Sequence, residues 1–189
     1  IISLELATEM VKQGGGHFVG AFVTLVMLKE LGPIMAAFAI VFMEGSSMAA
    51  EIASMKVTDQ VDALKTLNVN PIQYLIAPKV IAGILIVPAA VVVASLTGIL
   101  GGLFTSTANT ELTVMGYLES VRIGLFLKDI CASLVKGAVF GGIIAIVSAT
   151  IGYETKGGAL DVGKSTTKAV VWSITIAAIF DYIISALFI

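Results

Sequence analysis

The sequence predicts an all-α, polytopic helical integral membrane protein with four full membrane spans and the end of a truncated first span. Three observations lead to this fold class. Of the 189 residues, 58% are hydrophobic and only 13% are charged, and the mean hydropathy is +1.03. Soluble domains carry charge on roughly one quarter of their residues. This composition therefore excludes a typical soluble enzyme, a disulfide scaffold and a disordered linker.

The remaining totals exclude further classes of protein. The net charge is −2 and no basic run occurs, so the chain lacks the electrostatic footprint of a nucleic-acid partner. One cysteine, Cys131, cannot form an internal disulfide, and one histidine, His17, cannot build a zinc site. No metal site is predicted. The chain begins at Ile1 and residues 1–6 resemble the tail of a helix, so we expect the natural N-terminus to lie upstream.

Four segments are long and apolar enough to span a bilayer, which takes about 20 residues. In chain order they are residues 33–55, 80–107, 130–153 and 169–189. Glu44 and Glu51 interrupt the first of these segments, and Asp181 interrupts the last. A shorter apolar run at residues 18–28 is either the start of the first segment, bent at Pro33, or a separate helix.

Basic residues in the connections predict the orientation. The connections at residues 56–79 and 154–168 carry three lysines each. The connection at residues 108–128 carries only Arg122 and Lys128, and the first connection carries Lys12 and Lys29. Because Lys and Arg accumulate in cytoplasmic loops, we expect the three-lysine connections to face the cytoplasm and residues 108–128 to lie on the outer side.

Residues 57–68, in the first cytoplasmic connection, have the pattern of a short amphipathic helix. Val57, Val61 and Leu64 recur at helical spacing and Leu67 lies beside them, while the charged residues fall on other faces. Such a helix between two spans either lies on the lipid headgroups or docks into a groove of a soluble partner.

The ends and the polar face of this helix favour the soluble partner. Thr58 is the predicted N-cap, and Pro71 disfavours helix at Asn70, which sets the stop. The polar face is not strongly basic, which argues against binding to headgroups. The candidate docking residues are Val57, Asp59, Gln60, Val61, Asp62, Leu64 and Leu67.

Several motifs follow one another in a characteristic order over nearly the whole chain. They lie at residues 29–33 (KELGP), 49–52 (AAEI), 55–64 (MKVTDQVDAL), 67–71 (LNVNP), 77–79 (APK), 98–102, 157–158, 162–171 and 181–182. In this order they resemble the MlaE family, the permease subunits of bacterial ABC transporters that move phospholipids with an MCE-domain partner.

The resemblance implies an MlaE permease fold for residues 1–189 as a single domain, of which the interfacial helix and most of the first of five spans would precede this chain. It implies a homodimer in the bacterial inner membrane that moves lipid between the inner and outer membranes. Residues 56–71 match the coupling helix, which sits in a cleft of a cytoplasmic ABC ATPase. That partner would bind ATP and Mg²⁺, and this chain would hold no cofactor and would not be an enzyme.

Lipid would bind in an outward-facing cavity between the two permease subunits, beneath a hexameric ring of MCE domains. One position departs from the family. Family members commonly carry Arg two residues before the glycine that matches Gly45, whereas this chain has Met43 there and Glu44 next. A headgroup role for that arginine cannot be transferred to this chain.

Two acidic residues fall inside the first span, where an ionisable group costs about 2.5–3.5 kcal/mol. Glu44 and Glu51 are seven residues apart and share a face with Ser47. This polar stripe is a candidate lining of the lipid cavity or of the dimer seam. Alternatively, Glu51 lies in water near the cytoplasmic end or pairs with Lys56. A competing hypothesis makes Glu44 and Glu51 the carboxylate pair of an intramembrane lipid-modifying enzyme.

Two further ionisable residues lie in the later spans. Lys136 either snorkels toward water or faces a phospholipid phosphate in the cavity. Asp181 is expected to fix helix packing with Tyr182 or Ser185. Two glycine pairs, Gly98 with Gly102 and Gly137 with Gly141, have the four-residue spacing at which helix backbones can approach closely. In a chain with 19 glycines, such a spacing also arises by chance.

Overall fold

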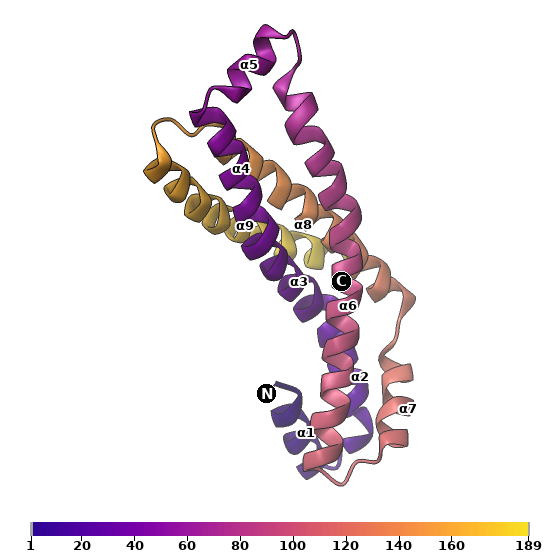
Figure 1. The fold of residues 1–189 in the computed structure, drawn as a ribbon. Helices are drawn as coiled ribbons and strands as arrows, with labels where there is room; N and C mark the ends of the chain where they lie inside the picture. Colours follow the sequence, from indigo (N-terminus) through magenta and orange to yellow (C-terminus); the bar gives the residue numbers. More distant parts are fainter. Residues whose placement is uncertain (1, 189) are drawn as a thin grey trace.

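The computed structural model describes residues 2–188, and every regular element in that range is a helix. Figure 1 shows an elongated bundle in which α6 runs along most of the molecule. The α-helices are α1 (Ile2–Lys12), α2 (Val19–Val26), α3 (Gly32–Ile40), α4 (Ser46–Val57), α5 (Gln60–Thr66), α6 (Ala77–Asn109), α7 (Val114–Gly124), α8 (Leu127–Tyr153) and α9 (Ala159–Phe188).

Four continuous helical runs are long and apolar enough to cross a membrane. They are Gly16–Val57, Ile72–Asn109, Leu127–Tyr153 and Ala159–Leu187. This confirms the predicted all-α polytopic membrane protein. The run at residues 18–28 is part of the first long helix and not a separate one. With 42 residues, that helical run would measure about 63 Å if straight, twice the thickness of the hydrocarbon.

The first run stays helical through Pro33, and its winding is wider in the turn just before that proline. Two π-helical segments, η2 (Met27–Leu31) and η3 (Val41–Gly45), flank α3. Proline lacks an amide hydrogen and crowds the preceding turn, and a wider π turn is one way in which a helix absorbs that disturbance. The result is a bent but unbroken helix from α2 to α4 (Figure 1).

The two ends of the molecule are built differently (Figure 1). At one end, which we call the α5 end, α5 lies above α4 and the start of α6, near the connection between α8 and α9. At the opposite end, the α7 end, α1, α2 and α7 surround the last part of α6. There the Ser120 hydroxyl accepts a 2.9 Å hydrogen bond from the Ala21 amide, and the buried Tyr117 hydroxyl donates to the Ile99 carbonyl at 3.1 Å.

The two connections around α8 contain more helix than the sequence predicts. Residues 108–128 include α7, which starts where the Thr113 hydroxyl accepts a hydrogen bond from the Gly116 amide at 3.2 Å. Helix α9 begins at Ala159, ten residues before the predicted span, with an Asp161–Lys164 ion pair in its first turns. Apolar length marks the part of a helix inside the membrane, so polar helical turns outside it were missed.

Helices α6 and α8 approach closely at glycines. A Cβ atom added to Gly83 would lie 2.7 Å from the Gly141 carbonyl oxygen, and one added to Gly141 would clash with the Gly83 carbonyl. One added to Gly137 would lie 3.0 Å from the Pro88 Cα. The other glycine pair serves side chains, because Gly98 makes room for the Met27 thioether and Gly102 for the Tyr117 hydroxyl.

We expect Gly141→Ala to lower the free energy of unfolding by about 1–3 kcal/mol, because an added methyl group must push the Gly83 backbone away. Gly101→Ala in the same α6–α8 pair of helices is the matched control, since a Cβ there meets nothing within 4 Å. Thermal unfolding in detergent micelles measures both variants. Equal unfolding midpoints would contradict the importance of this close approach.

Candidate functional site

A groove of about 370 Å³ opens between the first, second and third membrane-spanning runs. Its walls come from α3, η3 and α4 on one side and from α6 and α8 on the other. The lining is largely apolar, with Glu44, Ser47, Glu51 and Lys79 as its charged and hydroxyl groups. The remaining lining residues are Ile40, Met48, Ala82, Gly83, Ile86, Val87, Gly141, Ile144 and Ala145.

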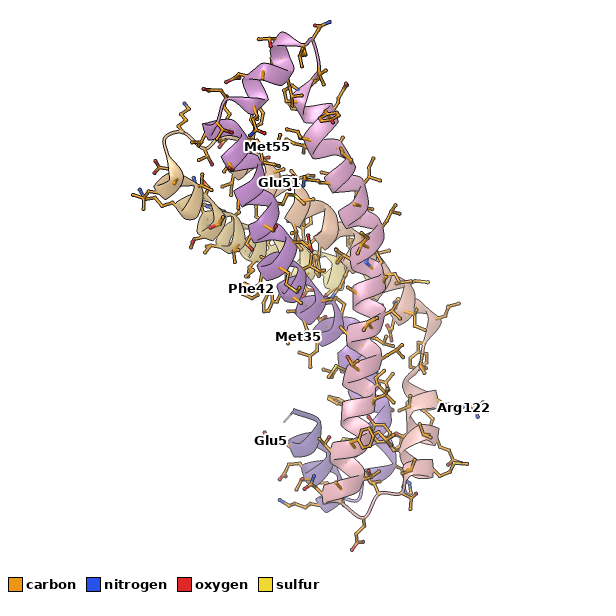
Figure 2. The ribbon with its side chains drawn as sticks, viewed as in Figure 1. Glu5, Met35, Phe42, Glu51, Met55 and Arg122 are labelled. Atoms are coloured by element: carbon orange, nitrogen blue, oxygen red, sulfur yellow. The ribbon has the colours of Figure 1, made fainter. Side chains whose placement is uncertain are left out.

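The helical spacing of Glu44, Ser47 and Glu51 therefore does place them along one wall of a cavity. Glu51, labelled in Figure 2, lies on α4. Its carboxylate forms an ion pair with the Lys79 ammonium at the start of α6, at 2.5 Å. Lys56, the predicted alternative partner, instead pairs with Asp62. Lys79 was not singled out from the sequence, although it closes the 77–79 motif at the foot of a span.

Close packing sets the position of this wall. A Cβ added to Gly45 would lie 3.2 Å from the side chains of Ile144 and Ser148 on α8. Gly45 ends the π-helical segment η3, and Glu44 precedes it. Because glycine lets α8 come close to this turn, its acidic neighbour Glu44 is held at the edge of the groove.

Helix α5 confirms a short helix in the first three-lysine connection, but its start differs from the predicted one. Thr58 is not its N-cap: the Thr58 hydroxyl donates to the Ser54 carbonyl at 2.8 Å and so belongs to the end of α4. Asp59 precedes α5 with φ at 59°, a left-handed conformation that turns the chain sharply. At the far side, the Asn70 side chain accepts a hydrogen bond from the Ile72 amide at 3.0 Å, just after Pro71.

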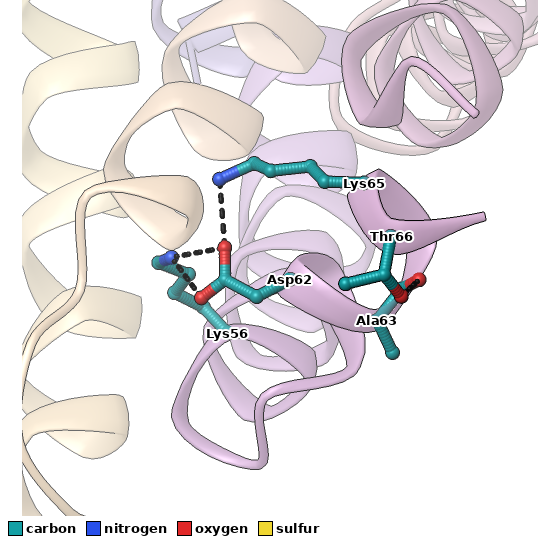
Figure 3. Close-up of polar contacts among 5 residues, drawn as sticks. All are labelled: Lys56, Asp62, Ala63, Lys65 and Thr66. Atoms are coloured by element: carbon teal, nitrogen blue, oxygen red, sulfur yellow. Dashed lines mark hydrogen bonds and ion pairs between the residues drawn. The ribbon is translucent and has the colours of Figure 1, made fainter. Parts of the chain in front are cut away.

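An ion cluster fastens α5 to the rest of the protein (Figure 3). Asp62 pairs with Lys56 of α4 at 3.0 Å and with Lys65 at 2.7 Å. Both ammonium groups also lie 5.9 Å from the centre of the Tyr153 ring at the end of α8. The hydrogen bonds from Lys65 and Lys56 lower the pKa of Asp62, and the bond to Asp62 raises the pKa of Lys65.

The structure divides the seven predicted docking residues into two groups. Val61 is fully buried and Asp62 is engaged by two lysines, so these two residues anchor the helix. Asp59, Gln60 and Leu67 are exposed, and the Leu67 side chain is 72% accessible. The two remaining residues, Val57 and Leu64, are partly buried.

Comparison with known proteins decides the family. The family described as permease MlaE matches residues 1–187. The chain belongs to the MlaE permease family. It is 39% identical over 187 residues to a probable ABC transporter permease protein of Rickettsia typhi, covering 99% of this chain and 72% of that protein. It is also 38% identical over 185 residues to a probable ABC transporter permease protein of Synechocystis, which covers 98% of this chain and 70% of that protein.

A more distant relative comes from a plant. The chloroplastic protein TRIGALACTOSYLDIACYLGLYCEROL 1 of Arabidopsis thaliana is 33% identical over 186 residues, which cover 98% of this chain and 53% of that protein. Together, family and relatives make this chain a multi-pass ABC transporter permease subunit. In the described residues of this MlaE-family chain, no group of three His, Cys, Asp or Glu side chains is placed to hold a metal ion.

Lys136 lies outside the groove and is the centre of a buried ionic cluster. Only 2% of Lys136 is accessible. Its ammonium contacts Asp181 at 2.8 Å, Glu30 at 3.2 Å, the Lys29 carbonyl at 2.6 Å and the Ser185 hydroxyl at 2.7 Å. The Ser185 hydroxyl in turn donates to Glu30 at 2.8 Å. We call these residues the Lys136 cluster.

The Lys136 cluster was only partly foreseen from the sequence. The two predicted alternatives were that Lys136 snorkels toward water or faces lipid in the groove, and both are wrong. Its ammonium instead contacts groups on two other helical segments. Asp181 joins Ser185 in the cluster, whereas Tyr182 is exposed. Glu30 was missed as a partner, since nothing local links it to a lysine 106 residues away.

We expect Lys136→Met to destabilise the protein by about 3–5 kcal/mol, because it leaves the nearly buried Asp181 and the partly exposed Glu30 without their cation. The double variant Lys136→Met with Asp181→Leu should recover part of this loss. Lys12→Met is the control, since the exposed Lys12–Glu9 pair is worth about 1 kcal/mol or less. Thermal unfolding in detergent measures all three variants. A Lys136→Met protein as stable as Lys12→Met would show that the cluster does not hold the helices together.

Proposed function

We propose that this chain is the membrane permease subunit of an ATP-driven phospholipid transporter that works between the inner and outer membranes of the bacterial envelope. The observation that carries the proposal is the groove: an apolar cavity of about 370 Å³ with a polar stripe on one wall, set between membrane-spanning helices. Acyl chains fit an apolar lining, and headgroups need a few polar contacts. Membership in a family of ABC transporter permeases supports the same conclusion.

The subunit's partners follow from the same proposal. A cytoplasmic ABC ATPase would bind the α5 end and supply ATP and Mg²⁺, and a hexameric MCE-domain protein would receive or deliver lipid at the α7 end. Two copies of the chain would form a homodimer. The α5 end carries the two three-lysine connections, which favours a cytoplasmic position for it in the inner membrane.

The contacts of α5 suggest how ATP binding would reach the groove. Asp62 and Lys56 join α5 to α4, and residues 67–76, which end in a π-helical turn, connect α5 to α6. A partner that displaces α5 would therefore move α4 relative to the start of α6. The Glu51–Lys79 ion pair spans that same gap, so the movement would widen or narrow the groove on its polar side.

The competing enzyme hypothesis finds less support. Glu44 and Glu51 are separated by two helical turns, about 10 Å along the axis, and Glu51 is occupied by Lys79. A pair of carboxylates that shares one substrate bond needs both groups near that bond. The hypothesis predicts turnover by the purified chain without any ATPase, and its observation would overturn the transport proposal.

We expect Leu67→Asp to release the ATPase while leaving the fold intact, because Leu67 is exposed and lies at the C-terminal end of α5. Loss of an apolar anchor at an interface corresponds to binding weaker by roughly tenfold or more. Native mass spectrometry of the detergent-purified complex measures the bound ATPase, MCE protein and phospholipid together. The wild type should carry all three, and Leu67→Asp should keep its phospholipid.

Leu160→Asp is the matched control, since Leu160 is an equally exposed leucine at the α5 end but belongs to the first turn of α9. Val61→Asp is unsuitable because Val61 is buried and its loss would disrupt α5 itself. Retention of the ATPase by Leu67→Asp would contradict docking through α5. A wild-type complex without phospholipid would contradict the proposed cargo.

A further inference from the structure

Glu44 is the groove's most unusual residue. It lines the groove and is itself exposed. It lies 13 residues before Val57, where α4 ends, which corresponds to about 20 Å along the helix. Its neighbours Phe42 and Met43 are large, exposed and apolar, as expected for a helix surface in contact with hydrocarbon. Glu44 therefore places a carboxylate well inside the membrane-spanning part of the chain.

No cation among the described residues neutralises Glu44. Within the described residues, no ion pair or side-chain hydrogen bond reaches its carboxylate, although eight ion pairs occur elsewhere. The groove's one lysine, Lys79, is held by Glu51, two helical turns away. With Glu51 and Lys79 compensating each other, the lining keeps one uncompensated negative charge.

A carboxylate in an apolar cavity needs a positive partner, because an unpaired charge is costly to remove from water. The rest of the lining is largely apolar, so the ligand that best complements it combines hydrocarbon with a cationic group. An ammonium donates short, charge-assisted hydrogen bonds to a carboxylate. A headgroup with only a phosphate would instead bring a second negative charge next to Glu44.

We propose that the groove selects phospholipids whose headgroup carries a primary ammonium, and that Glu44 binds this ammonium. The inference rests on the proposed function and deepens it by naming the class of lipid. The apolar residues Ile40, Ile86 and Val87 of the same lining would contact the acyl chains. Glu44 thereby acts as the specificity-determining residue of the groove.

The test uses the complex of the full chain with its ATPase, purified in detergent and equilibrated with an equimolar mixture of phosphatidylethanolamine and phosphatidylglycerol. Native mass spectrometry and lipid extraction give the ratio of the two bound lipids. We expect the wild type to favour phosphatidylethanolamine by about tenfold, the ordinary effect of one charged hydrogen bond. Glu44→Gln, which keeps the size of the side chain, should bring the ratio close to one at unchanged total lipid.

Glu119→Gln is the control, since Glu119 is an exposed carboxylate on α7, remote from the groove, and it should keep the wild-type ratio. A wild-type ratio near one, or an unchanged ratio in Glu44→Gln, would overturn the proposal. If Glu44→Gln also loses its homodimer while the lipid ratio stays unchanged, the cation that pairs with Glu44 lies on a second copy of the chain, which likewise overturns the proposal. Absence of both lipids from the wild type would contradict the proposed function instead.

Discussion

The buried ammonium of Lys136 is the contact on which the arrangement of the membrane helices depends. It lies on α8 and joins the junction of α2 and α3, through Glu30 and the Lys29 carbonyl, to Asp181 and Ser185 on α9. Apolar surfaces do not drive helices together inside a lipid bilayer, where lipid tails are equally apolar. A buried charge that must be satisfied supplies a specific reason for these helices to meet at one place.

From that point, two kinds of contact shape the rest of the molecule. Glycines bring α6 against α8 on one side of the groove, and Gly45 brings η3 against α8 on the other. The groove lies between these close approaches and is bridged at its polar end by Glu51 and Lys79. Helix α5, fixed to α4 by Asp62, stands where a partner would act on both walls at once. In the proposed transporter, close packing near Lys136 would stay in place while a partner that displaces α5 changes the width of the groove.

Sequence reasoning succeeded where one helix determines the answer. Apolar length identified four spans, and the helical period placed Glu44, Ser47 and Glu51 on one wall. It failed where the answer lies between helices. Nothing local pairs Lys136 with Glu30 or Lys79 with Glu51, and α7 and the first turns of α9 are too polar to register as membrane segments. Exposure also could not be read from spacing, since Val61 and Leu67 belong to one apolar pattern although only Leu67 is free to bind.

In the proposed transporter, nucleotide bound to the partner ATPase would move α4 against α6 through α5. Spin labels can be attached to Ser54→Cys on α4 and Ile81→Cys on α6, two exposed positions, in a Cys131→Ser background. Double electron–electron resonance then measures the distance between the two labels. We expect ATP to shift the inter-label distance in the assembled complex by at least about 2 Å, the scale of helix shifts in switching proteins. An identical distance distribution with and without ATP, while the ATPase stays bound, would contradict it.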